Sequence, residues 1–128
     1  MSEHLRLFQL LTLSAALVTP VASPTPIGTI TDITVAVNGI GPRSQDCGSF
    51  VVTPPQVQAF LSRAVLLSGR QVHDFFLYGP CSARGTVRSR YDTWQWEIRN
   101  MGTGSITATN GDTFLLGDPA QESSLADE

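Results

Sequence analysis

The sequence predicts an α+β fold in which one helix packs on an antiparallel sheet of five or six strands. Three observations support this. Trp94, Trp96 and Ile98 alternate with polar residues, the period-two pattern of a strand with one buried face. Asn110 and Gly111 lie between two strand-like runs, a pair typical of tight hairpins. One stretch in the first half of the chain carries an apolar stripe at helical spacing.

We expect the helix to span residues 54–67. Thr53 can cap it, and Gln56 stands three residues later, as a capping box requires. Pro54 suits the first helical position. A helix with a single apolar face must cover another element, and the sheet is the candidate. The residues of the stripe are Val57, Phe60, Leu61 and Ala64.

The strands are expected on both sides of this helix. The run at 29–39 is rich in β-branched residues, and its alternation places Ile33, Val35 and Val37 on one face. A C-terminal β-meander follows: strands at 84–90 and 93–99, then a hairpin whose Asn-Gly pair suits a type I′ turn. For 71–78 we expect a strand, although the spacing of its apolar residues also fits a helix. The predicted core is Ile33, Val35, Val57, Phe60, Leu61, Val87, Trp94, Trp96, Ile98, Ile106 and Phe114.

The chain divides into four parts. Residues 1–23 are expected to be an export signal, with Arg6 before an apolar run that is too short to span a bilayer. The alternative is an amphipathic N-terminal helix. Residues 24–28 form a linker, 29–117 a single α+β domain, and 118–128 an acidic disordered tail.

The formal net charge is −3, and there is no lysine. The acidic residues concentrate in the tail, so the expected domain is nearly neutral. We expect no nucleic-acid partner, no stable membrane span, no metal and no cofactor. The oligomeric state is left open.

Cys47 and Cys81 are the two cysteines. In an oxidising compartment they most simply pair as a structural disulfide. A redox-active pair would need a Cys-x-x-Cys motif, which is absent from the sequence. His73 could add a third ligand for zinc, but the spacing matches no metal motif.

His73 and Asp74 are the one neighbouring His–acid pair of the expected domain. On a strand, adjacent side chains point to opposite faces and would not meet. A catalytic pair would need Asp92 or Asp112 to approach His73 from elsewhere. A small hydrolase is therefore kept as an alternative, with a surface histidine as the simpler interpretation.

Four arginines form the candidate binding face. Arg84, Arg88 and Arg90 share one parity along a strand, and Arg99 lies nearby. With Trp94 and Trp96 they could form a nucleic-acid platform, but the net negative charge and the absence of lysine disfavour it. The remaining interpretations are a solvated face and a docking surface for an acidic protein.

The run from Thr53 to Gly117 resembles small exported proteobacterial proteins. The residues that carry the likeness are Thr53-Pro54, Phe60, the HD pair at 73–74, GPCSARGT at 79–86, Trp96 and GTGSIT at 102–107. The resemblance implies a periplasmic, single-domain protein and transfers no site residues. The expected function is non-enzymatic binding or inhibition of another protein, as immunity proteins do. An envelope-associated structural accessory protein is the alternative.

Overall fold

The computed structural model describes residues 25–76 and 79–120, apart from the side chain of Phe75. The elements follow one another along the chain as β1 (Ile30–Ile40), the short 3-10 turns η1 (Arg43–Gln45) and η2 (Cys47–Ser49), α2 (Pro54–Arg63), β2 (Val65–Leu67), α3 (Gly69–Phe75), β3 (Ser82–Ser89), β4 (Thr93–Arg99), β5 (Thr103–Thr107) and β6 (Thr113–Gly117).

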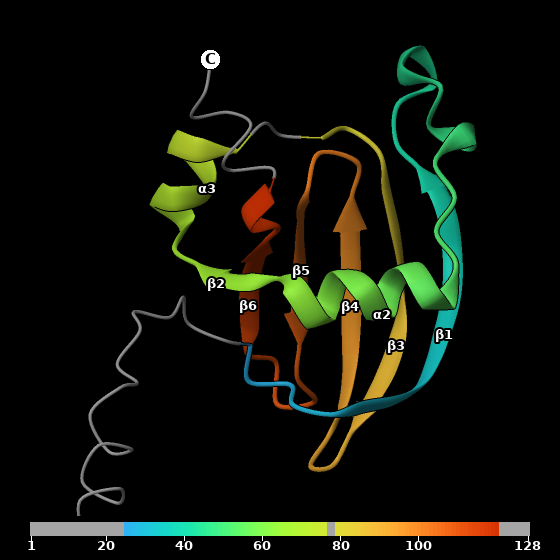
Figure 1. The fold of residues 1–128 in the computed structure, drawn as a ribbon. Helices are drawn as coiled ribbons and strands as arrows, with labels where there is room; N and C mark the ends of the chain where they lie inside the picture. Colours follow the sequence, from blue (N-terminus) through green and yellow to red (C-terminus); the bar gives the residue numbers. More distant parts are fainter. Residues whose placement is uncertain (1–24, 77–78, 121–128) are drawn as a thin grey trace, which may run out of the picture.

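The strands form one six-stranded antiparallel sheet in the order β1-β3-β4-β5-β6-β2. Strands β3 to β6 are the predicted meander, and each pairs with the next along the chain. Helix α2 lies across one face of the sheet (Figure 1). The predicted α+β fold is confirmed.

Helix α2 begins as predicted and ends earlier than predicted. The Thr53 amide donates to Gln56 Oε1 at 2.9 Å, which is one half of the capping box. The helix ends at Arg63, because the next three residues pair with β6 as strand β2. As an edge strand, this apolar run places Leu66 against the core, while Leu67 lies against Gly117. If α2 continued to residue 67 with its single apolar stripe, one of these two leucines would have no apolar contact.

The core lies between α2 and the sheet. Trp96, Ile106 and Val57 are at most 1 % exposed. Burying side chains of this kind stabilises the fold by roughly 1.5–3 kcal/mol each. The predicted core is confirmed: eight of its residues are buried, and three pack partly buried against them, namely Ile33, Val35 and Phe114.

Strand β1 does not keep the simple alternation that its sequence suggests. Its pairing with β3 shifts at three places, and Asp32 has a left-handed φ of 52°. Each extra residue in one strand reverses which face the following side chains occupy. Val35 therefore pairs with Gly85, whereas Val37 pairs with Arg84 and is 42 % exposed. The prediction that Val37 shares a buried face with Val35 is wrong.

The disulfide between Cys47 and Cys81 is formed, with a Cα–Cα distance of 5.1 Å. It joins η2 to the residue before β3, and both cysteines are buried. Gly41 lies directly beside it, where a Cβ atom would collide with the Cys47 sulfur. The loop after β1 is therefore fixed to the sheet.

The strand expected at 71–78 is wrong, because residues 69–75 form α3. Ser68 caps this helix, accepting from the Gln71 amide at 3.1 Å, and Gln71 Oε1 accepts from the Ser68 amide at 2.8 Å. The spacing of the apolar residues fits both a strand and a helix, and this capping box favours the helix. Leu77 and Tyr78, also part of that expectation, lie outside the described residues.

The predicted hairpin between β5 and β6 is present with another turn. Gly111 has a φ of 96°, whereas Asn110 does not have a positive φ. The Gly111 amide donates to the Ala108 carbonyl, and the Ala108 amide donates to the Asp112 carbonyl. This is a three-residue loop in which only the glycine needs the left-handed region, so a type I′ turn is excluded.

The domain extends beyond the predicted limits at both ends. Ile27, assigned to the linker, is 3 % exposed and belongs to the core. Asp118, assigned to the tail, donates its amide to the Gly102 carbonyl at 2.8 Å and pairs with Arg63 at 3.1 Å. The expected signal at 1–23 and the rest of the expected tail, 121–128, lie outside the described residues.

Candidate functional site

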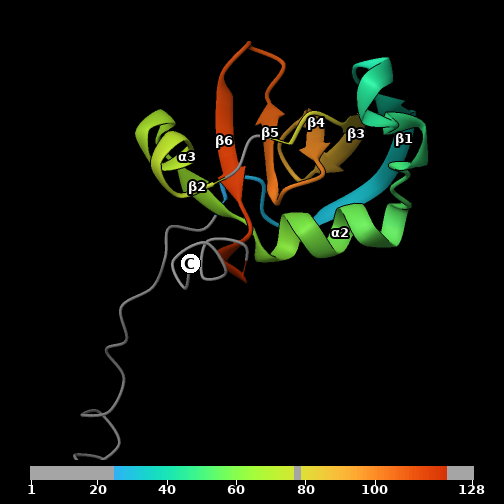
Figure 2. The ribbon, with the colours of Figure 1, turned by 90° about the horizontal axis from the view of Figure 1, so that it is seen from above.

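The candidate site is the sheet face opposite α2, called here the open face. Directly paired residues of neighbouring strands point to the same face, so the register defines it. Seen from above, α2 lies on one side of the sheet, and no described helix covers β3 or β4 on the other side (Figure 2). Three rows of paired residues make up the open face: Thr31, Arg88 and Thr93; then Thr34, Thr86, Gln95, Thr107 and Thr113; then Val37, Arg84, Glu97, Ser105 and Leu115.

Two of the four predicted arginines are exposed on this face without a partner. Arg84 and Arg88 both lie on β3, four residues apart, which is about 13 Å along an extended strand. Neither side chain has a hydrogen bond or ion pair to any described residue. Their guanidinium groups are thus available to a ligand.

The other two arginines are placed differently. Arg99 lies at the end of β4, outside the three rows, and is engaged, with Nε 3.3 Å from Glu97 Oε1 and Nη1 donating to the Gly79 carbonyl at 3.0 Å. Arg90 lies past the end of β3, with its guanidinium 5.5 Å from the centre of the Tyr91 ring. The structure therefore places Arg84 and Arg88 in the rows of the open face, and places neither Arg99 nor Arg90 there.

A hollow of about 420 Å³ lies in the middle of the open face. The hollow forms where the long side chains of Arg84, Gln95 and Glu97 lie beside shorter side chains of the neighbouring strands. The small lining residues are Ala36, Thr86 and Ser105. Sequence reasoning did not identify Gln95 or the hydroxyl residues as part of a site. The alternation of β4 did indicate that Gln95 faces away from the core, but only the register shows which residues lie beside it.

A second hollow of about 330 Å³ lies beside α2, with Phe50, Val52 and Ile98 among its lining residues. Both arginines at its rim are already engaged. Arg63 pairs with Asp118, and Arg99 pairs with Glu97. This hollow therefore offers less unsatisfied charge than the one on the open face.

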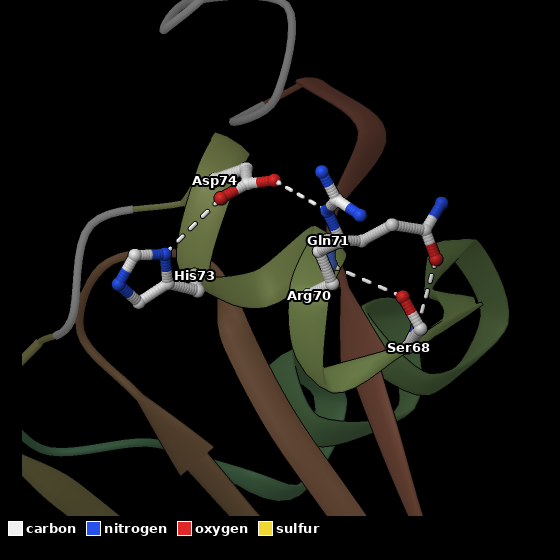
Figure 3. A network of polar contacts seen from close by, with 5 residues as sticks. All are labelled: Ser68, Arg70, Gln71, His73 and Asp74. Carbon is white, nitrogen blue, oxygen red and sulfur yellow. Dashed lines mark hydrogen bonds and ion pairs between the residues drawn. The ribbon is translucent and has the colours of Figure 1, made fainter.

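His73 and Asp74 do meet, contrary to the argument from a strand. Both lie on α3, with His73 Nδ1 3.1 Å from Asp74 Oδ1, and Arg70 Nε is 3.4 Å from the other carboxylate oxygen (Figure 3). The His73 side chain is 89 % exposed, and neither hollow is lined by it. Exposed ion pairs of this kind contribute at most about 1 kcal/mol to stability.

The two other carboxylates considered as partners of His73 have local roles. Asp92 accepts from the Thr93 amide at 2.7 Å and from the Thr109 hydroxyl at 2.9 Å. Asp112 contacts Asn110 in the adjacent loop. The hydrogen bond from Thr109 is the main reason that the pKa of Asp92 lies below its ordinary value, and backbone amides add to it. These contacts stabilise turns and do not orient the histidine.

Within residues 25–76 and 79–120, no group of three His, Cys, Asp or Glu side chains is arranged to hold a metal ion. No helix in those two segments is long and apolar enough to cross a membrane. Comparison of the chain with protein-family models, with curated proteins and with solved structures finds no match. The geometry of the open face is therefore the basis on which a function is proposed.

Proposed function

We propose that this protein acts by binding an acidic protein partner through the open face, without chemistry of its own. One observation carries the proposal: Arg84 and Arg88 are both exposed on the same uncovered face, with no charge partner among the described residues. Most exposed charges on a folded surface are solvated singly. Two unpaired arginines on a rigid strand present a fixed pattern to a partner.

The charge of the open face differs in sign from that of the whole chain. The chain carries a formal net charge of −3. Of the charged residues in the three rows, Arg84 and Arg88 are positive and Glu97 is negative, and Glu97 is already paired with Arg99. Because the rest of the domain is nearly neutral, this positive face would attract and orient an acidic partner.

The scaffold supports binding by a preformed surface. The disulfide fixes the end of β1 to the start of β3, and the open face is built from paired strands. A surface that is already ordered loses little conformational entropy when a partner docks. This favours a binding protein whose face needs no rearrangement.

We place the protein in the periplasm or outside the cell. Its disulfide supports an oxidising compartment, as does the export signal expected from residues 1–23. The intact mass of protein from the native host tests this. Cleavage of about the first 22 residues is expected, and a full-length chain would contradict export.

The binding function can be tested by site-specific photo-cross-linking in the native host. A photoreactive phenylalanine analogue replaces Gln95 on the open face or, as a matched control, Gln58 on the exposed side of α2. We expect one discrete protein adduct from position 95, and none from position 58. The adduct should belong to a protein with an acidic surface.

Charge-reversal variants make this test specific. R84E/R88E should abolish the adduct at position 95. R43E/R70E changes the net charge equally at exposed sites outside the open face, and should leave the adduct intact. Adducts from position 58 alone, or adducts at position 95 that are unaffected by R84E/R88E, would overturn the proposal.

A further inference from the structure

We infer that the hollow on the open face binds one carboxylate side chain, an aspartate or glutamate from the protein partner. The inference rests on the proposed function and names the contact that anchors it. The hollow measures about 420 Å³. A water molecule in liquid occupies roughly 30 Å³, so the hollow has room for a side chain together with some of its hydration.

The pairing of charges around the hollow leaves Arg84 available. Arg84 lies directly opposite Glu97 in the β3–β4 ladder, where an ion pair between them would be the simplest outcome. Glu97 instead pairs with Arg99, two residues further along its own strand, at 3.3 Å. Arg99 thus engages the one carboxylate of the hollow, and the Arg84 guanidinium remains without a partner among the described residues.

The other polar groups of the hollow are suited to the same ligand. The amide of Gln95 and the hydroxyls of Thr86 and Ser105 can each donate a hydrogen bond. None of the three side chains has a hydrogen bond to another described residue. The planar fork of an arginine matches the two oxygens of a carboxylate, and such charge-assisted pairs are about twice as strong as neutral hydrogen bonds.

Glu97 is the carboxylate among the lining residues of the hollow. Its carboxylate lines the same hollow and would repel an incoming anion. That repulsion is larger for a phosphate group, which carries nearly two negative charges at neutral pH, than for a carboxylate with one. The attraction to Arg84 grows with the same charge, so a comparison with a phosphorylated side chain tests whether the hollow distinguishes the two groups.

Titration of ¹⁵N-labelled protein with short blocked peptides tests the inference. The probe is Ac-Gly-Glu-Gly-Glu-Gly-NH₂, compared with the same peptide carrying glutamine or phosphoserine in place of glutamate. We expect the glutamate peptide to shift the amides around Arg84, Gln95 and Ser105 and the side-chain Nε–H of Arg84. The glutamine peptide should bind at least several-fold more weakly, and the phosphoserine peptide should bind no more tightly than the glutamate peptide.

Variants on the same face separate a specific contact from general electrostatics. R84Q should weaken the glutamate peptide about tenfold or more, because hydrogen bonds to charged groups contribute ~1.5–3 kcal/mol. R84K keeps the charge without the fork and should give an intermediate loss. R88Q removes the other unpartnered arginine of β3, which does not line the hollow, and should change affinity less than twofold. The amide spectrum of each variant checks that it is folded.

Several results would overturn the inference. The glutamine peptide could bind as tightly as the glutamate peptide, or the phosphoserine peptide could bind more tightly. R84Q and R88Q could reduce the affinity for the glutamate peptide equally. The glutamate peptide could also leave the amides around the hollow unshifted. The photo-cross-linking experiment then shows which proposal has failed. If the adduct at position 95 forms and depends on charge, but the peptide does not bind in the hollow, this inference is wrong and the proposed function is still supported. Absence of that adduct removes the proposed function itself.

Discussion

Asp92 connects two turns that are distant in sequence. Its carboxylate accepts from the Thr93 amide, next to the β3–β4 turn, and from both the amide and the hydroxyl of Thr109, in the β5–β6 loop. These donors favour the ionised form, so the pKa in the folded protein lies below the ordinary value of 3.8. A lowered pKa stabilises the fold above the unfolded-state pKa, and this stabilisation is lost as the pH falls through the folded-state value.

We therefore expect D92N to lower the unfolding temperature at pH 7. The new amide group would face the Thr109 N–H, so two donors would meet. The difference from the wild type should shrink as the pH falls below 3.8, where the wild-type carboxylate also becomes protonated. Thermal unfolding at pH 7 and pH 3 measures both effects. D46N, at an exposed position away from these turns, is the control, and a D92N deficit that is equal at both pH values would contradict the argument.

Among the helices and strands, the sequence predicts correctly those elements that a single local signal is sufficient to specify. The alternation of β4, the capping box of α2 and the Asn-Gly loop each lie within a few residues, and the structure shows all three elements. The prediction of a strand at 71–78 is wrong because the spacing of the apolar residues allows both structures, and the capping box at Ser68 and Gln71 favours the helix.

Longer-range features could not be predicted in the same way. Strand β2 exists only because β6 is beside it, and the bulges of β1 appear only in its pairing with β3. The hollow depends on register as well, since Ala36, Arg84 and Ser105 come from three different strands. Shared parity along the strand predicts that Arg84 and Arg88 lie on one face. Whether they form ion pairs cannot be predicted in this way, because it depends on the contact between Glu97 and Arg99.

The close approach of β1, β3 and β4 gives a prediction for these elements. A Cβ atom on Gly85 would collide with the Thr34 carbonyl of β1 and lie 2.8 Å from the Trp96 ring of β4. Since the first contact is with backbone, a strand must move. We expect G85A to reduce the free energy of unfolding by about 1–3 kcal/mol, as overpacked cores do.

Chemical denaturation measures this change. G69A is the matched control, because nothing lies within 4 Å of a Cβ atom at the first residue of α3. That substitution should be neutral or slightly stabilising, since alanine restricts the unfolded chain and favours helix. Equal stability of G85A and the wild type would show that β1 adapts to the extra atom, and that the sheet is less rigid than the proposed binding surface requires.

For the molecule as a whole, the disulfide fixes the loop after β1 to the start of β3. Cys47 and Cys81 are separated by 34 residues, and the segment between them contains α2, β2 and α3. Constraining a loop of that length in the unfolded chain stabilises the fold by roughly 3–4 kcal/mol in the chain-entropy model. That is a large part of the 5–15 kcal/mol that typically holds a small domain together.

We expect C47S/C81S to lose about that amount and to show where the molecule opens first. Urea unfolding should give a lower midpoint, and a reductant should affect the wild type but not the variant. In hydrogen exchange, amides of η2 and of the end of β1 should lose protection while β3, β4 and β5 keep theirs, because the bond holds η2 and the Gly39 amide of β1 donates to the Phe50 carbonyl just after η2. Uniform loss across the sheet would contradict this order. Since Ala36 of β1 lines the hollow, the variant should also bind the acidic peptide more weakly even where it remains folded.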